Sequence, residues 1–96
     1  MHKQAQHKLR FFYFMPYTYI LYSAALDKYY VGATNNLEDR LNRHNTDSDK
    51  FTSKGQPWAL VYSEEYPTKS EAMKREREIK SKKSRKYIEQ LISLTE

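Results

Sequence analysis

The chain has 96 residues, a length that favours a single domain with a modest hydrophobic core. It contains no cysteine, which excludes disulfides and thiolate zinc sites and fits a reducing, cytoplasmic location. Its formal net charge of +5 favours a polyanionic partner, with nucleic acid ahead of an anionic membrane surface.

Residues 1–16 are predicted to be an N-terminal extension, and residues 17–96 to form the domain. The first ten residues are polar and basic, which is typical of a flexible leader. The apolar run at residues 11–15 is far too short to span a bilayer, and no small-residue cleavage site follows Pro16. We therefore expect no membrane partner, and aromatic side chains that pack on the domain or pair along its sheet.

Two strands are predicted at residues 17–23 and 29–33, because both segments are rich in β-branched and aromatic residues. Residues 24–28 form the turn of an antiparallel hairpin. No Asn-Gly or Asp-Gly pair occurs there, so we expect a turn longer than two residues. Gly32 stands at the end of the second strand, where a backbone can approach another group closely.

A helix follows, and one of three polar residues is expected to cap it: Thr34, Asn35 or Asn36. Leu37 and Leu41 lie four residues apart and define its buried stripe. At about 100° per residue, His44 falls close to Leu37 and Arg40 falls on the flank of the stripe. Both side chains should therefore project toward the sheet.

A polar loop at residues 45–57 leads to a third predicted strand at residues 58–66. Residues 68–71, Thr-Lys-Ser-Glu, match a capping box that opens a helix running to about residue 83. A second helical pattern begins at Ser84. It places four apolar residues on one face: Tyr87, Ile88, Leu91 and Ile92.

A carboxylate faces inward on the first of these two helices. The apolar residues of this helix occupy one arc: Ala72, Met73 and Ile79. Glu76 falls inside that arc, whereas Arg75 falls outside it. An inward carboxylate is costly unless it is paired, and either an ion pair with Arg40 or a divalent metal would pair it.

These residues resemble the motifs of the GIY-YIG nuclease superfamily. Residues 17–19, Tyr-Thr-Tyr, stand where that family has its first motif, and residues 30–32, Tyr-Val-Gly, where it has the second. Arg40, His44 and Glu76 follow in the family's order. The resemblance covers residues 17–92 and is closest to the small single-domain bacterial branch.

The resemblance implies an α+β domain with a three-stranded antiparallel sheet flanked by helices, in the order β-β-α-β-α-α. It implies a metal-dependent endonuclease that hydrolyses phosphodiester bonds in DNA, with Mg²⁺ or Mn²⁺ held by Glu76. Arg40 would hold a phosphate oxygen. Tyr30 would orient or deprotonate the attacking water beside Tyr19. His44 is the alternative base, because its ordinary pKa lies nearer neutrality, and the sequence does not rank the two.

A basic run after the glutamate is the predicted phosphate-binding patch, although a solvated basic face explains it equally well. The predicted nucleic-acid-binding residues are Gly32, Lys80, Lys82, Lys83, Arg85 and Lys86. The rival hypothesis is a nucleic-acid-binding module that has lost catalysis, since the late asparagine of many family members has no counterpart here. An RNA substrate is a lesser alternative, and the oligomeric state stays open.

Overall fold

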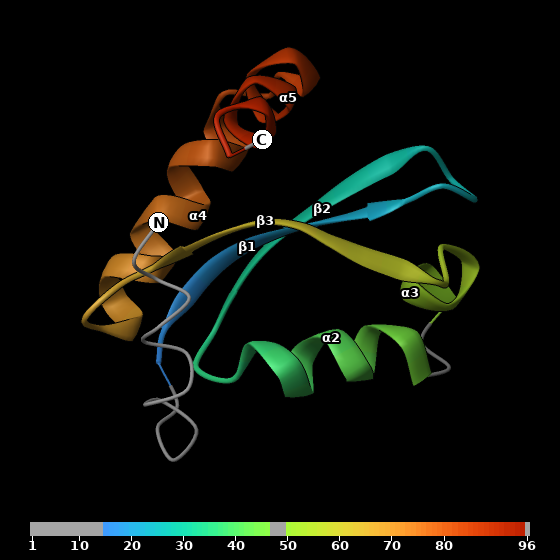
Figure 1. The fold of residues 1–96 in the computed structure, drawn as a ribbon, viewed down its shortest axis with the longest axis horizontal. Helices are drawn as coiled ribbons and strands as arrows, with labels where there is room; N and C mark the ends of the chain where they lie inside the picture. The colour runs from blue at the N-terminus through green and yellow to red at the C-terminus, as the bar shows by residue number, and fades with distance from the viewer. Residues whose placement is uncertain (1–14, 47–49, 96) are drawn as a thin grey trace.

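The computed structural model describes residues 15–46 and 50–95. The chain order is β1 (Tyr17–Ser23), β2 (Lys28–Thr34), α2 (Leu37–Thr46), α3 (Lys50–Lys54), β3 (Trp58–Glu65), α4 (Lys69–Ser81) and α5 (Arg85–Ser93) (Figure 1). This confirms the predicted α+β class. The predicted N-terminal extension lies almost wholly outside the described residues. No helix in the described ranges is long and apolar enough to cross a bilayer.

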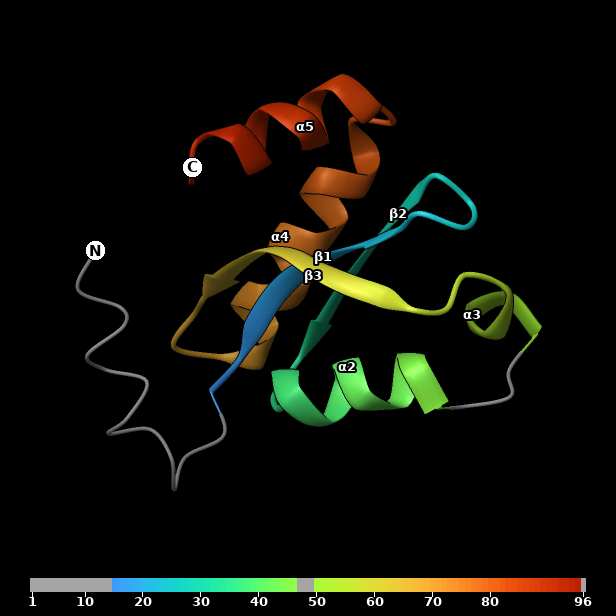
Figure 2. The same cartoon turned by 45° about the vertical axis from the view of Figure 1, so that its right-hand side comes forward.

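The three strands form one antiparallel sheet in the order β2-β1-β3, which makes β2 an edge strand. Tyr19 in the central strand lies opposite Gly32 of β2 and Ser63 of β3. Two layers of helices enclose the sheet. The pair α4 and α5 covers one face, and α2 with α3 covers the other (Figures 1 and 2).

Each face of the sheet has its own core, because successive strand residues point to opposite sides. On the face toward α4 and α5, Ile20 and Val31 pack with Ile79 and Leu91. On the face toward α2, three buried side chains pack against leucines of that helix: Tyr19, Leu21 and Trp58. The strand alternation therefore decides which residues can reach α2 and which can reach α4.

Local hydrogen bonds explain where the helices begin. Of the three candidate caps of α2, Asn36 performs the role, since its side chain accepts from the backbone N–H of Asp39 at 3.1 Å. Thr68 caps α4 as predicted, with its hydroxyl accepting from the N–H of Glu71 at 3.1 Å, while the Glu71 carboxylate accepts from that hydroxyl. Ser84 caps α5 in the same way.

Three predicted boundaries need correction. The helix expected to run to residue 83 ends at Ser81, because Lys83 adopts a left-handed backbone with φ 48° that a right-handed helix cannot include. The strand expected over residues 58–66 ends at Glu65. The loop expected over residues 45–57 contains α3 and the end of α2.

The burial predicted on α4 is wrong at two positions. Met73, expected in the core, is 41% exposed. Arg75, expected to point outward, is only 20% exposed and binds Glu64 of β3 at 2.9 Å. The side of α4 that carries Arg75 is covered by β3 and α5, neighbours that a helical wheel does not include.

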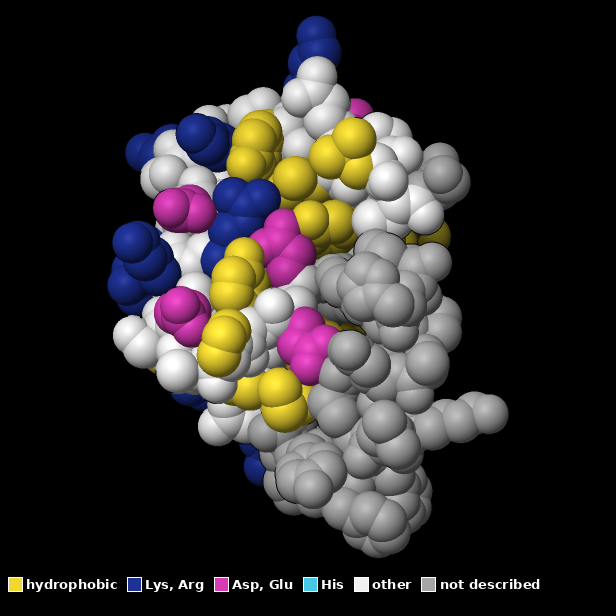
Figure 3. Space-filling model, turned by 60° about the vertical axis from the view of Figure 1, so that its left-hand side comes forward, with side chains coloured by type: hydrophobic (Ala, Val, Ile, Leu, Met, Phe, Trp, Pro, Cys, Tyr) yellow, Lys and Arg dark blue, Asp and Glu magenta, His cyan; other side chains and the backbone are white. Residues whose placement is uncertain are grey.

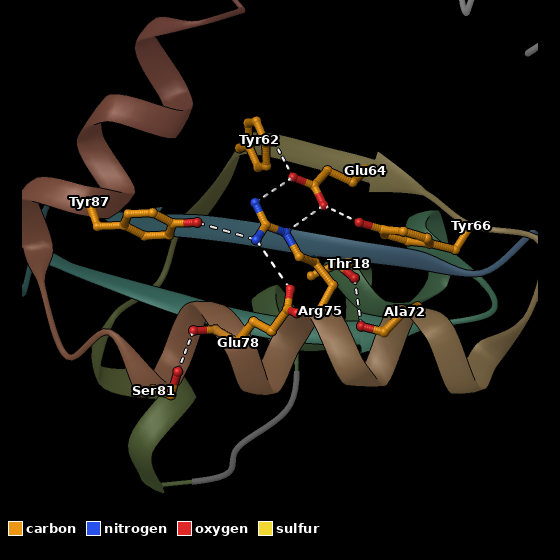
Figure 4. Close-up of polar contacts among 9 residues, drawn as sticks. All are labelled: Thr18, Tyr62, Glu64, Tyr66, Ala72, Arg75, Glu78, Ser81 and Tyr87. Carbon is orange, nitrogen blue, oxygen red and sulfur yellow. Dashed lines mark hydrogen bonds and ion pairs between the residues drawn. The ribbon is translucent and has the colours of Figure 1, made fainter.

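Arg75 joins three elements through one polar cluster, which Figure 4 shows. Its guanidinium donates to both carboxylate oxygens of Glu64 and to the hydroxyl of Tyr87 in α5. Tyr62 and Tyr66 donate to the same carboxylate. Figure 3 brings the left-hand side of Figure 1 forward and shows acidic side chains among hydrophobic ones, with Lys and Arg both along the left margin and beside the acidic side chains in the centre (Figure 3).

Candidate active site

The site is built around Tyr19, which is only 1% exposed in the central strand. Its ring lies over Gly32, its partner in β2. A Cβ atom added at Gly32 would meet the Tyr19 hydroxyl oxygen at 2.5 Å and Cζ at 2.6 Å. The close approach expected at Gly32 is thus made by Tyr19. Contact of Gly32 with nucleic acid stays a prediction.

Tyr19, Tyr30 and His44 form an aromatic cluster between the sheet and α2. The Tyr19 hydroxyl lies 3.3 Å from Nε2 of His44. The ring centroids of Tyr30 and His44 are 4.6 Å apart in an edge-on arrangement, and those of Tyr19 and Tyr30 are 6.5 Å apart. His44 is 6% exposed, as its position beside Leu37 on the helix predicted.

Trp58 completes this cluster and was not predicted as part of it. Its ring centroid lies 6.1 Å from that of Tyr30 and 6.2 Å from that of His44. The sequence offered one signal, a large aromatic residue at the start of the third strand. Asn45, directly after His44, fixes the start of that strand, because its side-chain amide bonds both the N–H and the carbonyl of Trp58.

Arg40 extends from α2 toward the same hydroxyl and lowers its pKa. Burial nevertheless raises the pKa of Tyr19 to about 12, against the effect of the nearby guanidinium. Tyr19 therefore stays protonated at neutral pH, and its hydroxyl proton is available to Nε2 of His44.

Glu76 approaches from α4, which packs against β2 and β1 from the other face of the sheet. Its negative charge makes a minor contribution to the raised pKa of Tyr19. Its carboxylate is 21% exposed and accepts a charged hydrogen bond from Lys80 at 2.6 Å. Lys80 is thus its ion-pair partner in the structure, whereas the sequence left open an ion pair with Arg40 or a divalent metal.

The structure brings four of the five predicted site residues together. Tyr19, Tyr30 and His44 pack on one another, and Arg40 lies close enough to the Tyr19 hydroxyl to lower its pKa. Glu76 lies on α4, which covers the other face of the sheet, and it is linked to the four through its electrostatic effect on Tyr19.

In the basic run at residues 80–86, some side chains contact other groups of the protein and others are exposed. Arg85 pairs with Asp27 at 2.7 Å and with Glu89 at 3.0 Å. Lys82 lies 5.4 Å from the centroid of the Tyr87 ring. Lys86 and Lys83 are exposed. Phosphate binding by this run stays a prediction.

The donor set fits one kind of metal site. Among the described residues, no group of three histidine or carboxylate side chains could enclose an ion. Glu76, the predicted ligand, offers a partly exposed carboxylate that holds one cationic group, the ammonium of Lys80. Mg²⁺ commonly binds through one or two carboxylates and takes water and substrate phosphate for the rest, so Glu76 suits Mg²⁺ or Mn²⁺.

Comparison with known proteins gives concordant matches. The family model of the GIY-YIG catalytic domain matches residues 15–88. The UPF0213 protein of Staphylococcus haemolyticus is 47% identical over 53 residues, which cover 54% of this chain and 65% of that relative. The UPF0213 protein of the archaeon Natronomonas pharaonis is 42% identical over 66 residues, which cover 68% of this chain and 76% of that protein.

A solved structure agrees with these relatives. The solution NMR structure of the UPF0213 protein BH0048 from Bacillus halodurans matches with a TM-score of 0.53 and 36% identity, over 82% of this chain and 83% of that one. The chain spans a little less than two thirds of the staphylococcal relative's length. With the family model matched over most of its residues, the chain belongs to the GIY-YIG catalytic domain family, a family of nucleases.

Proposed function

We propose that the protein is a divalent-metal-dependent endonuclease that hydrolyses phosphodiester bonds in DNA. The observation that carries the proposal is that three other predicted site residues act on the hydroxyl of Tyr19. His44 bonds it, Arg40 lies near it and lowers its pKa, and Glu76 acts on its charge from the opposite helix layer. Hydrolysis of a phosphodiester needs a cationic phosphate clamp, a placed water and a charged group for the leaving oxygen, and this cluster offers a residue for each.

Arg40 is the phosphate clamp. Its side chain is partly exposed and lies near the Tyr19 hydroxyl, whose pKa it lowers. The donors of its guanidinium match two oxygens of a phosphate in the bidentate geometry that guanidinium groups favour.

Tyr30 is the residue that orients the attacking water. Tyr19 is a poor base at neutral pH, because burial raises its pKa to about 12. His44 is buried, and its Nε2 faces the Tyr19 hydroxyl. Tyr30 is partly exposed and packs on His44, so its hydroxyl can meet water. His44 is then a positioning residue for both tyrosines.

Glu76 is the residue that would hold the metal. A bound Mg²⁺ or Mn²⁺ supplies charge neutralisation for the phosphate and for the leaving oxygen. Lys80 binds one carboxylate oxygen at 2.6 Å and orients the group.

Glu76→Gln tests the proposal, because it keeps the shape of the side chain and removes the charge. The wild type is expected to cut DNA with Mg²⁺ or Mn²⁺ and to stop in EDTA. The variant should lose at least roughly 10²-fold in rate, the scale for one preorganised charged element, and still bind DNA.

Glu78→Gln is the matched control, since it makes the same change on the same helix at a side chain that is 53% exposed. It should cut at the wild-type rate. Cleavage by purified Glu76→Gln at the wild-type rate would contradict the proposal. So would an equal loss in both variants, which would point to a general effect of removing charge from α4.

The second candidate is a nucleic-acid-binding module without catalysis, and one observation favours it. Lys80 satisfies the Glu76 carboxylate without a metal, as an ordinary pair at i and i+4. DNA binding by the wild type with no cleavage of any DNA form in either metal would select this candidate. Cleavage of RNA in place of DNA would select the RNA-directed variant of the nuclease.

A further inference from the structure

A pocket of about 490 Å³ lies at the outer edge of β2, where α4 turns into α5. This volume is within the range of pockets that hold small organic ligands. Most of its lining belongs to the face of the sheet toward α4. Tyr30 also lines it, although the ring of Tyr30 packs with Tyr19 and His44 on the face toward α2. We call it the edge pocket, and the roles proposed above involve two of its lining residues, Tyr30 and Lys80, but assign it no ligand.

The floor of the edge pocket is apolar. Val31, Ile79 and Ile88 line it, together with the ring of Tyr29. The guanidinium carbon of Arg85 lies 5.0 Å from the centroid of that ring. Apolar side chains with an aromatic ring and a planar guanidinium are the surfaces on which an unpaired nucleobase packs.

The rim of the edge pocket is cationic. Lys28, Lys80 and Lys83 line it, in addition to Arg85. Arg85 is neutralised by Asp27 and Lys80 by Glu76. Within residues 15–46 and 50–95, Lys28 and Lys83 make no ion pair, so two positive charges remain for a phosphate.

The backbone at Lys83 adds an independent observation. Its φ of 48° lies in the left-handed region, where glycine is the favoured residue directly after a helix. A side chain there is disfavoured by local sterics. The residue that stands at this position nonetheless carries a long cationic side chain, and that side chain lines the edge pocket.

The edge pocket adjoins the candidate active site through Lys80 and β2. Lys80 lines the pocket and holds the Glu76 carboxylate at 2.6 Å. Along β2, Tyr29 and Val31 face the pocket, and Tyr30 between them packs on His44. Lys80 and β2 therefore connect the edge pocket to two residues of the candidate active site, Glu76 and Tyr30.

We propose that the edge pocket binds one unpaired nucleotide of the substrate strand, with its base on the apolar floor and its phosphate at Lys28 and Lys83. The inference rests on the proposed function and narrows its substrate to DNA with unpaired nucleotides beside the bond that is cut. A base in a continuous duplex is stacked and paired, and entering the pocket would cost that stacking. The pocket therefore selects single-stranded, gapped or overhanging DNA over blunt duplex.

The test measures binding by the full chain in EDTA, at one fixed salt concentration. The probes are a fluorescent single-stranded oligonucleotide, its blunt duplex and the same single strand with abasic sites. Lys83→Gly removes the pocket cation and gives the backbone its favoured residue, so its thermal stability should equal or exceed that of the wild type. Lys86→Ala is the matched control, because it removes one charge from the same run at a residue outside the pocket.

The wild type should bind the single strand at least about tenfold more tightly than the duplex, the scale of one stacked base. Lys83→Gly should remove most of this preference, whereas Lys86→Ala should weaken both probes alike and preserve it. Equal binding of the abasic and intact strands would show phosphate contacts only and overturn the inference. A preference unchanged in Lys83→Gly would also overturn it. Failure of the nuclease proposal would appear in the cleavage assay, either as cleavage by Glu76→Gln or as no cleavage by the wild type. The binding assay contains no metal, so its result does not depend on cleavage.

Discussion

At the scale of single residues, the contact between Tyr19 and Gly32 decides the geometry of the site. The ring occupies the space that a side chain at position 32 would fill, with its hydroxyl 2.5 Å from that Cβ position. From there the hydroxyl bonds His44 and lies near Arg40. Gly32, the glycine of the second motif, thus leaves open the space that Tyr19, the tyrosine of the first motif, occupies.

Gly32→Ala should displace the Tyr19 ring. Overpacking of this kind costs about 1–3 kcal/mol of unfolding free energy, and displacement of a positioning group by about 1 Å can cost roughly 10²-fold in rate. Urea unfolding and the cleavage rate measure the two effects.

Ala33→Gly is the control in the same strand. It should cost about 0.5–1 kcal/mol through backbone entropy and leave the cleavage rate unchanged. Wild-type stability in Gly32→Ala would contradict the steric argument.

The sequence predicted most of the site at this scale, because helical phase fixes directions. His44 is buried and Arg40 lies on the flank of the stripe, as their spacing from Leu37 required. It could not predict Trp58 in the aromatic cluster, since that contact depends on how β3 enters the sheet. Nor could it predict that Glu76 pairs with Lys80, because several cations lay within reach of α4.

At the scale of elements, the ion pair between Arg75 and Glu64 fastens α4 to β3, and Tyr87 extends the link to α5. Burial alone would raise the pKa of the Glu64 carboxyl. Hydrogen bonds from Arg75, Tyr62 and Tyr66 outweigh that and hold its pKa below the usual range. Each helix that covers the α4 face of the sheet is therefore tied to the same carboxylate.

Glu64→Gln should lower the unfolding free energy at neutral pH by about 2 kcal/mol, because Arg75 loses a mostly buried partner. The folded pKa lies below the unfolded one, so the wild-type advantage is present above the unfolded pKa and disappears as pH falls through the folded pKa. Urea unfolding of both proteins from pH 7 into the acid range, below about 4.3, measures this. Glu78→Gln, at the exposed partner of the same arginine, should change stability little. A wild-type advantage that persisted at the acid end would contradict the assignment.

The ends of the elements were harder to predict than their existence. The capping box at Thr68 and the cap at Ser84 are local signals, and both form. The end of α4 has no such signal, because the residue in the left-handed position is Lys83 and not glycine. Arg75 and Met73 were misassigned for a related reason: a wheel with one buried arc cannot describe a helix that contacts both a sheet and α5.

At the scale of the whole molecule, the candidate active site and the edge pocket both include residues of β2, an edge strand of a small sheet. The strand order is β2-β1-β3, and α2 and α4 cover opposite faces of this sheet (Figure 2). The candidate active site lies on one side of β2 and the edge pocket on the other. The order of elements could be predicted because each strand and helix carries its own pattern, whereas the pocket depends on the packing of β2 against the turn between α4 and α5.

The distribution of charge over the molecule leads to the last prediction. The net charge is +5, and the basic run from Lys80 to Lys86 lies beside the candidate site. Affinity for duplex DNA should fall linearly with salt on logarithmic axes, with a slope of about 0.9 for each phosphate contact. Replacing Lys82 and Lys86 by alanine should flatten the slope by about one to two units.

Lys54 and Lys74 provide the matched control, since both are exposed and removing them changes the net charge by the same amount. If the basic run contacts phosphates, the control pair should shift the slope by less than about half a unit, because it alters only the long-range field. Equal changes in the two double variants would mean that net charge alone governs binding. If only the Lys54 and Lys74 variant altered the salt slope, the DNA would bind another face of the molecule. The proposals for the active site and the edge pocket would then both lose their geometric basis.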